Sequence, residues 1–274
     1  MNHTRTTLVN FEDLDLPDTV YKYRDWNNKW HKSIINERQV YMSAPMDFED
    51  KLDCKNHIRY DLLTDDEIRW KYYMESKKDT SRAHLSEKEH EKFAEEWFQK
   101  SPLHDKERIK ELQEQDFLAF NERTGILCLT ANPIRPEMWV KYSREHTGFC
   151  VGFNPKIMFK YLGGGQEVIY CDPLPTIKPR PWDSLENQMI KQIYHKESKW
   201  AFEEEYRTQV FNIDPLTKEQ RAVTLPIEAY KEIIFGAKIS EKNKNEISSI
   251  AKKIIPHITF RQATLIEDLV KIES

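Results

Sequence analysis

The chain lacks most of the features that mark specialised classes of protein. It has only 7 Gly in 274 residues, which argues against glycine-rich linkers, collagen and repeat arrays. Its 42 Lys and Arg do not outnumber its 46 Asp and Glu, so it has no basic excess with which to bind nucleic acid through bulk charge. A membrane-spanning helix needs about 18 consecutive apolar residues, and the apolar runs here are much shorter. We therefore expect neither membrane insertion nor bulk-charge binding of nucleic acid.

The amino terminus and the cysteines also lack recognisable signals. The first residues contain neither the apolar stretch nor the small-residue cleavage site of a secretory leader. The four cysteines include no C-x-x-C pair, so neither a zinc site nor a disulfide framework is indicated. The sequence predicts a cytoplasmic protein with free thiols and without a structural metal.

Aromatic residues, by contrast, are plentiful at 12% of the chain, and these large side chains can fill a core. Between residues 62 and 122 the composition changes to dense Glu, Lys, Asp and Gln, with aromatic residues at roughly helical intervals. Ser86 and Glu89 in this stretch form the pattern of a helix capping box. We expect one domain over residues 1–274, with a helical insertion over 62–122 whose charged faces are solvated.

The rest of the chain alternates short strands with helices. Trp26, Trp30 and Ile34 recur every fourth residue and predict a helix after the first strand. The runs that favour strands are short and rich in β-branched or aromatic residues: residues 19–24, 40–43, 126–130, 148–153, 168–170, 206–211, 232–235 and 258–266. Because the elements do not follow a regular βαβα order, the pattern favours an α+β fold.

Two acidic clusters are candidates for chemistry. If a strand begins near Phe202, its period of two places Glu203, Glu205 and Arg207 on one face. Carboxylates so arranged can hold a cation, act as acid and base, or stabilise positive charge on a substrate; the alternative is a solvent-facing strand that charge keeps soluble. The second cluster, residues 47–53, could bind a hard cation or form a charged turn.

Six separated blocks of sequence resemble the bacterial domain-of-unknown-function family numbered 2971. The resemblance runs in order from about residue 19 to residue 236. Its blocks are Tyr21–Arg24, Val40–Pro45, Cys128–Thr130, Met138–Tyr142, Trp200–Arg207 and Glu232–Gly236. The chain departs from the family pattern in the loop at Glu49 and Lys51, where the family usually has Asn and Pro.

A more distant similarity relates the chain to ADP-ribosyltransferases, which carry Arg, Ser and Glu on three successive segments. This similarity implies an ADP-ribosyltransferase-like core with a mixed or antiparallel sheet, and NAD as a substrate. It implies that Glu205 bonds to the ribose hydroxyl and that Glu203 orients or deprotonates the acceptor. The residues that it assigns to the cofactor are Arg24, which would meet the phosphates, and Tyr23, Tyr41 and Ser43.

Three functions follow from these patterns. The leading hypothesis is an NAD-consuming enzyme that transfers ADP-ribose to a macromolecular acceptor or hydrolyses NAD, as a toxin or phage-defence effector. The first alternative is a domain that binds a ligand or partner without chemistry, in which Glu203, Glu205 and Arg207 form a charge network. The second is a metal-dependent nuclease in which Asp50, Asp53 and the two glutamates gather around magnesium.

Overall fold

The computed structural model describes residues 15–273, and these form two compact units. The first, here called the sheet unit, comprises residues 15–44, 124–170 and 198–273. The second, the helical unit, comprises residues 45–123 and 171–197. The helical insertion expected over residues 62–122 lies within the helical unit, which has wider bounds and also takes in a later segment of the chain.

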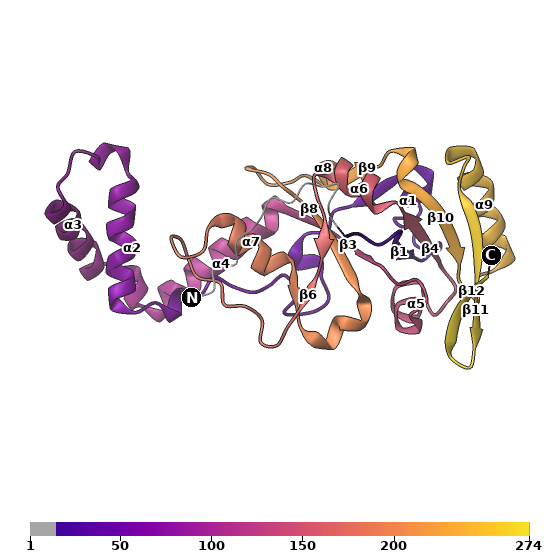
Figure 1. The fold of residues 1–274 in the computed structure, drawn as a ribbon, viewed down its shortest axis with the longest axis horizontal. Coiled ribbons are helices and arrows are strands. Elements are labelled where there is room, and N and C mark those ends of the chain that lie inside the picture. Colours follow the sequence, from indigo (N-terminus) through magenta and orange to yellow (C-terminus); the bar gives the residue numbers. More distant parts are fainter. Residues whose placement is uncertain (1–14, 274) are drawn as a thin grey trace. The chain divides into compact units, whose positions relative to one another are not determined.

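The sheet unit contains most of the strands (Figure 1). Its elements are β1 (Val20–Arg24), α1 (Ser33–Asn36), β2 (Gln39–Tyr41), β3 (Thr124–Thr130), α5 (Pro136–Tyr142), β4 (Phe149–Phe153), α6 (Pro155–Leu162), β5 (Gln166–Glu167), β6 (Ile169–Tyr170), β8 (Glu205–Phe211), α8 (Lys218–Arg221), β9 (Ala222–Thr224), β10 (Tyr230–Phe235), α9 (Glu241–Ile254), β11 (Thr259–Ile266) and β12 (Leu269–Glu273).

Eight of these strands form one mixed sheet in the order β12-β11-β10-β4-β1-β3-β8-β5. Strands β10 and β11 run parallel, and α9 connects them; the other neighbours are antiparallel. Strands β2 and β9 pair separately. The expectation of an α+β fold with a mixed sheet is therefore confirmed.

Each face of the large sheet has its own apolar core because side chains alternate along the strands. On one face, Leu127 and Val151 pack with residues of α6 and α9, such as Phe159 and Ile247. On the other face, Tyr21, Tyr23, Cys150 and Ile234 pack with Met138 and Trp139 of α5 and with Ala263 and Val270 of the β11–β12 hairpin. The central strands are thus buried on both sides, so a charged residue on them needs a specific partner.

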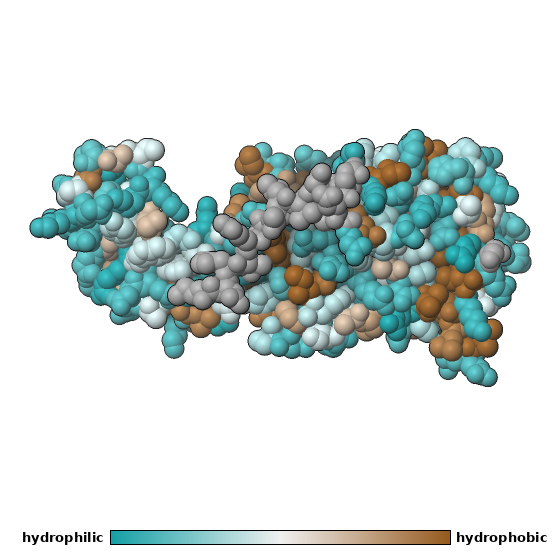
Figure 2. Space-filling model, in the orientation of Figure 1, coloured by the Kyte–Doolittle hydropathy of each residue, from teal (hydrophilic) through white to brown (hydrophobic). Residues whose placement is uncertain are grey.

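The helical unit contains α2 (Asp65–Lys78), α3 (Glu87–Gln99), α4 (Lys106–Arg123), α7 (Leu185–Ile193) and the short β7 (His195–Lys196). The capping box of Ser86 and Glu89 is present at the start of α3, which confirms that prediction. Only His90, Ala94 and Phe98 of α3 are buried, and Figure 2 shows a largely hydrophilic surface over α2 and α3. No helix among residues 15–273 is long and apolar enough to cross a membrane.

Two local predictions are wrong. Residues 198–203 form a 3₁₀ helix, and β8 begins at Glu205 rather than near Phe202. The helix expected from Trp26 onward is confined to α1, because Asp25 and Asn28 side chains accept the backbone N–H groups of Asn27 and Trp30 and hold the chain in turns.

Candidate functional site

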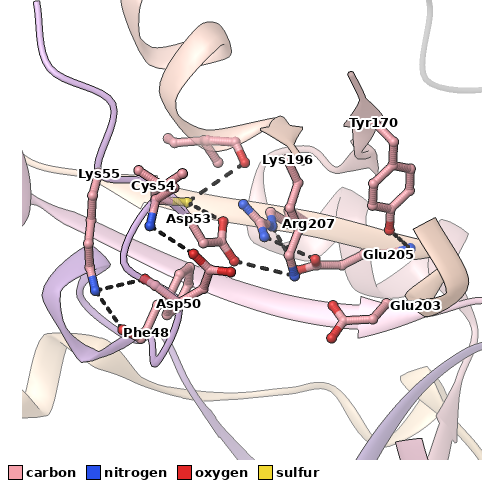
Figure 3. Close-up of polar contacts among 12 residues, drawn as sticks. Phe48, Asp50, Asp53, Cys54, Lys55, Tyr170, Lys196, Glu203, Glu205 and Arg207 are labelled. Atoms are coloured by element: carbon pink, nitrogen blue, oxygen red, sulfur yellow. Dashed lines mark hydrogen bonds and ion pairs between the residues drawn. The ribbon is translucent and has the colours of Figure 1, made fainter. Parts of the chain in front are cut away.

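A buried ion pair lies at the start of β8. The Nε and Nη2 atoms of Arg207 donate to Oε1 and Oε2 of Glu205 at 2.7 and 2.9 Å. The two side chains are 0% and 4% exposed. This is the two-pronged geometry that a planar guanidinium favours. The backbone N–H of Glu205 also donates to the Tyr170 hydroxyl at 2.9 Å (Figure 3). The carboxylate of Glu205 is thus held in one orientation.

Glu203 is buried beside this pair, although it lies in the 3₁₀ helix rather than in the strand. Its Oε1 accepts a hydrogen bond from the Tyr142 hydroxyl at 3.0 Å, and its backbone oxygen accepts from Thr130 Oγ1 at 2.6 Å. Between the two acids, Glu204 has a left-handed backbone with a φ of 43° and pairs with Arg135 at 3.0 Å. The left-handed backbone conformation of Glu204, rather than strand alternation, therefore leaves the side chains of Glu203 and Glu205 buried while that of Glu204 reaches the surface.

The register of β3 places Ser43 on the same face as the ion pair. Ser43 and Ile126 exchange backbone hydrogen bonds of 2.9 and 2.8 Å. Further along β3, Cys128 lies opposite Arg207, and Thr130 lies opposite Glu205. Directly opposed residues share a face, as do residues two apart on a strand. Ser43 and Glu205, which the sequence places 162 positions apart, thus face the same side of the sheet.

Lys22 lies where β1 separates from β3. These two strands pair only at Tyr21 and Thr130, and beyond that point Lys22 Nζ donates to the backbone oxygen of Cys128 at 2.6 Å. The pKa of Lys22 is lowered to about 8, chiefly by burial and in part by the neighbouring positive charge of Arg24. The negative charges of Glu205 and Glu203 act in the opposite direction. Lys22 is therefore within electrostatic reach of Arg24 and of both acids.

Arg24, at the end of β1, is paired with Phe149 of β4 and shares its face with Lys22 rather than with Tyr23. Its Nη1 donates to the backbone oxygen of Tyr23 at 3.2 Å. Burial lowers its pKa to about 10. Because side chains alternate along a strand, Arg24 leaves β1 on the sheet face opposite to that of Glu205. The two side chains can approach one another only where β1 separates from β3.

The two predicted tyrosines lie in different surroundings. Tyr23 is buried, with its ring 4.9 Å from that of Trp139 in an edge-on contact and its hydroxyl donating to Asn132 O at 3.1 Å. Tyr41 is 41% exposed on β2, opposite Ala222. Three further neighbours of the acids were not predicted from the sequence: Lys22, Tyr142 and Tyr170. For Lys22 a signal exists, since a lysine between two tyrosines at the centre of a strand is unusual.

The acidic cluster of residues 47–53 belongs to the helical unit and is held by lysines (Figure 3). Lys196 Nζ lies 3.3 Å from Asp53 Oδ2, with both side chains less than 10% exposed. Lys55 Nζ donates to the backbone oxygens of Phe48 and Asp50 at 2.6 and 3.0 Å. Within residues 15–273, no three His, Cys, Asp or Glu side chains gather in a way that could hold a metal ion.

Comparison with known proteins found one match. Residues 138–208 match the model of a family described as a protein of unknown function (DUF2971). The matched segment includes Tyr142, Tyr170, Glu203, Glu205 and Arg207. The match supports the family resemblance over about a quarter of the chain. Neither the search of curated proteins nor the search of solved structures found a significant match.

Proposed function

We propose that the protein is an NAD-consuming enzyme with ADP-ribosyltransferase-like chemistry, which transfers ADP-ribose to a macromolecule or hydrolyses NAD. The observation that carries the proposal is the position of Lys22, which reaches from β1 to the backbone oxygen of Cys128 on β3 and is influenced by the charges of Arg24, Glu205 and Glu203. The shared face of Ser43 and Glu205 supports it further. Two of the three segments that the sequence resemblance requires, those of Ser43 and Glu205, thus share one face of the sheet, and Arg24 of the third segment lies two residues from Lys22.

In this proposal each acid has a distinct role. Breaking the bond between nicotinamide and ribose gives the sugar oxocarbenium character, and a carboxylate that is already oriented stabilises that charge more than it stabilises neutral ribose. The proposal assigns this task to Glu205, which Arg207 holds through two hydrogen bonds. Glu203, bonded to Tyr142, would orient or deprotonate the acceptor. Arg24 would contact the phosphates of NAD.

The test measures nicotinamide release from NAD by the whole chain. We expect turnover in the wild type and a loss of at least about 100-fold in Glu205→Gln, because removing a group that stabilises transition-state charge costs roughly 10²–10³ in rate. Glu204→Gln is the matched control, since Glu204 is the adjacent acid and pairs instead with Arg135 at the surface. Equal rates for Glu205→Gln and the wild type would remove Glu205 from the mechanism.

A second candidate function, binding without chemistry, is favoured by the burial of the Glu205–Arg207 pair. Removing two charges from water is costly, and the two-pronged contact of the pair offsets part of this cost. Such a pair can serve to fix one conformation of a binding surface. A rise in melting temperature with NAD, without any release of nicotinamide, would favour this function over the enzymatic one.

A further inference from the structure

The loop that follows β1 brings two hydrogen-bond donors together. The backbone N–H of Asp25 donates to Nδ1 of His31 at 3.1 Å. Because a backbone N–H can only donate, Nδ1 is the bare nitrogen, and the neutral ring carries its hydrogen on Nε2. The side-chain oxygen of Asn28 accepts the backbone N–H of Trp30 at 3.0 Å, which fixes Nδ2 of Asn28 as a donor. Nδ2 and Nε2 lie 3.5 Å apart, so two donors face one another.

Two cations lie next to this loop, because Lys22 and Arg24 share a face of β1 and Arg24 directly precedes Asp25, whose backbone N–H bonds to His31. Burial lowers the pKa of His31 to about 4, and the positive charges of Arg24 and Lys22 contribute to this shift. Within residues 15–273, no carboxylate lies within 4 Å of the Lys22 ammonium or the Arg24 guanidinium, whose hydrogen bonds go to backbone oxygens. The nearest acid in the sequence, Asp25, is engaged by Arg144 at 3.6 Å and by Asn27.

Glu205 and Glu203 act on Lys22 only from beyond 4 Å, so among residues 15–273 no anion directly contacts the two cations. Partly buried donors and cations in such a cluster favour the binding of an anion. We propose that Lys22, Arg24, Asn28 and His31 form a binding site for a tetrahedral oxyanion of the phosphate class. The two cations supply charge, and Nε2 of His31 and Nδ2 of Asn28 supply directed hydrogen bonds. The inference deepens the proposed function, in which Arg24 contacts the phosphates of NAD. The inference adds Lys22, Asn28 and His31 to the residues that would contact the phosphates. Anion binding can be measured whether or not the protein cleaves NAD.

The experiment measures sulfate binding by isothermal titration calorimetry, because sulfate remains a dianion between pH 5 and 10. We expect one saturable site in the wild type and affinity at least about tenfold weaker in Arg24→Gln and in Lys22→Met, since each removes a charged contact. Affinity should also fall as the pH rises through 8, where Lys22 loses its proton. Pyrophosphate and ADP, titrated in parallel, distinguish a bare anion from a nucleotide as the preferred ligand.

Asn28→Asp is the most selective variant. Its carboxylate keeps the acceptor for the Trp30 N–H and replaces the Nδ2 donor with an anionic oxygen next to His31. The site would then hold its own anion, so sulfate binding should disappear while the melting temperature stays the same or rises. Asn36→Asp is the control, because it makes the same change of charge at an exposed position of the sheet unit.

Two results would overturn the inference. One is sulfate affinity that is unchanged in both Arg24→Gln and Asn28→Asp. The other is an equal loss of affinity in Asn36→Asp, which would indicate a general effect of net charge. Nicotinamide release is scored separately, so sulfate binding in a protein that does not cleave NAD would retain this site and reject the proposed enzyme.

Discussion

The large sheet carries two pairs of charged residues that differ in how their charge is balanced. Glu205 and Arg207 neutralise one another on β8 through two short hydrogen bonds. Lys22 and Arg24 on β1 have the same sign, lie two residues apart, and donate to backbone oxygens rather than to carboxylates. The first pair combines opposite charges in direct contact, whereas within residues 15–273 the second has no carboxylate within 4 Å.

This difference separates two uses of buried charge. A balanced pair keeps a functional side chain in place, because any movement would expose an unpaired ion to an apolar environment. An unbalanced pair raises the free energy of the unliganded protein and so favours a ligand of opposite charge. The comparison therefore assigns an orienting role to Arg207 and a ligand-binding role to Lys22 and Arg24.

The largest expected effect comes from breaking the balanced pair. Arg207→Met removes both hydrogen bonds to the Glu205 carboxylate and leaves that charge buried without its bidentate partner. We expect the free energy of unfolding, measured by urea denaturation, to fall by about 3–5 kcal/mol. The exposed Arg135–Glu204 pair provides the control, since Arg135→Gln should cost less than about 1 kcal/mol.

Arg207→Lys covers the case in which Arg207→Met does not fold. It retains the charge but cannot reproduce the planar two-pronged contact. We expect it to fold with a smaller loss of stability and to release nicotinamide more slowly than the wild type. Unfolding free energies that are equal for Arg207→Met and Arg135→Gln would contradict the balanced-pair interpretation.

The next effect concerns pH and His31, whose surroundings include Arg24, Lys22, Asp25 and Asn28. Its folded pKa of about 4 lies below its ordinary value, so the unfolded chain binds a proton first as the pH falls from about 6.5 to 4. Stability should decline through this window by about 1–2 kcal/mol, after allowance for screening by solvent. The loss should be complete below pH 4 and absent above about 6.5.

His31→Asn tests this decline, because an asparagine oxygen can replace Nδ1 as the acceptor of the Asp25 N–H without titrating. The variant should lose less stability than the wild type between pH 6.5 and 4 in urea denaturation. Parallel curves for the two proteins would show that other groups cause the acid sensitivity. His84→Asn, at an exposed position of the helical unit, serves as the control and should follow the wild type.

Several elements could be predicted from sequence because local signals and tertiary packing agree there. The alternation of Val20–Arg24 marks β1, and the capping box of Ser86 and Glu89 marks the start of α3. The helix expected from Trp26 fails because the four-residue spacing does not reveal that Asp25 and Asn28 side chains stabilise turns instead. Local hydrogen bonds of this kind compete directly with a helix.

The residue types of the candidate site could be predicted from the sequence, but the contacts between these residues could not. The sequence places Glu203, Glu205 and Arg207 close together, yet their burial depends on the left-handed turn at Glu204, for which no glycine or asparagine gives a signal. The contact of Tyr142 with Glu203 spans 61 positions. Such contacts depend on strand order and register, which residue spacing does not encode.

The smallest expected change in the free energy of unfolding comes from Lys22→Met, and it contrasts most clearly with the large change expected for Arg207→Met. Lys22→Met removes a cation whose folded pKa of about 8 lies below its ordinary value, so its penalty to stability is fully present below pH 8 and disappears above about 10.5. At pH 7 the relief of this penalty offsets the lost hydrogen bond to Cys128, and the change in unfolding free energy should stay within about 1 kcal/mol.

As the pH rises from 7 to 10, the wild type should gain stability relative to Lys22→Met, because only the wild type loses a buried positive charge. A loss at pH 7 as large as that of Arg207→Met would mean that Lys22 is balanced after all, and the distinction between the two pairs would fail.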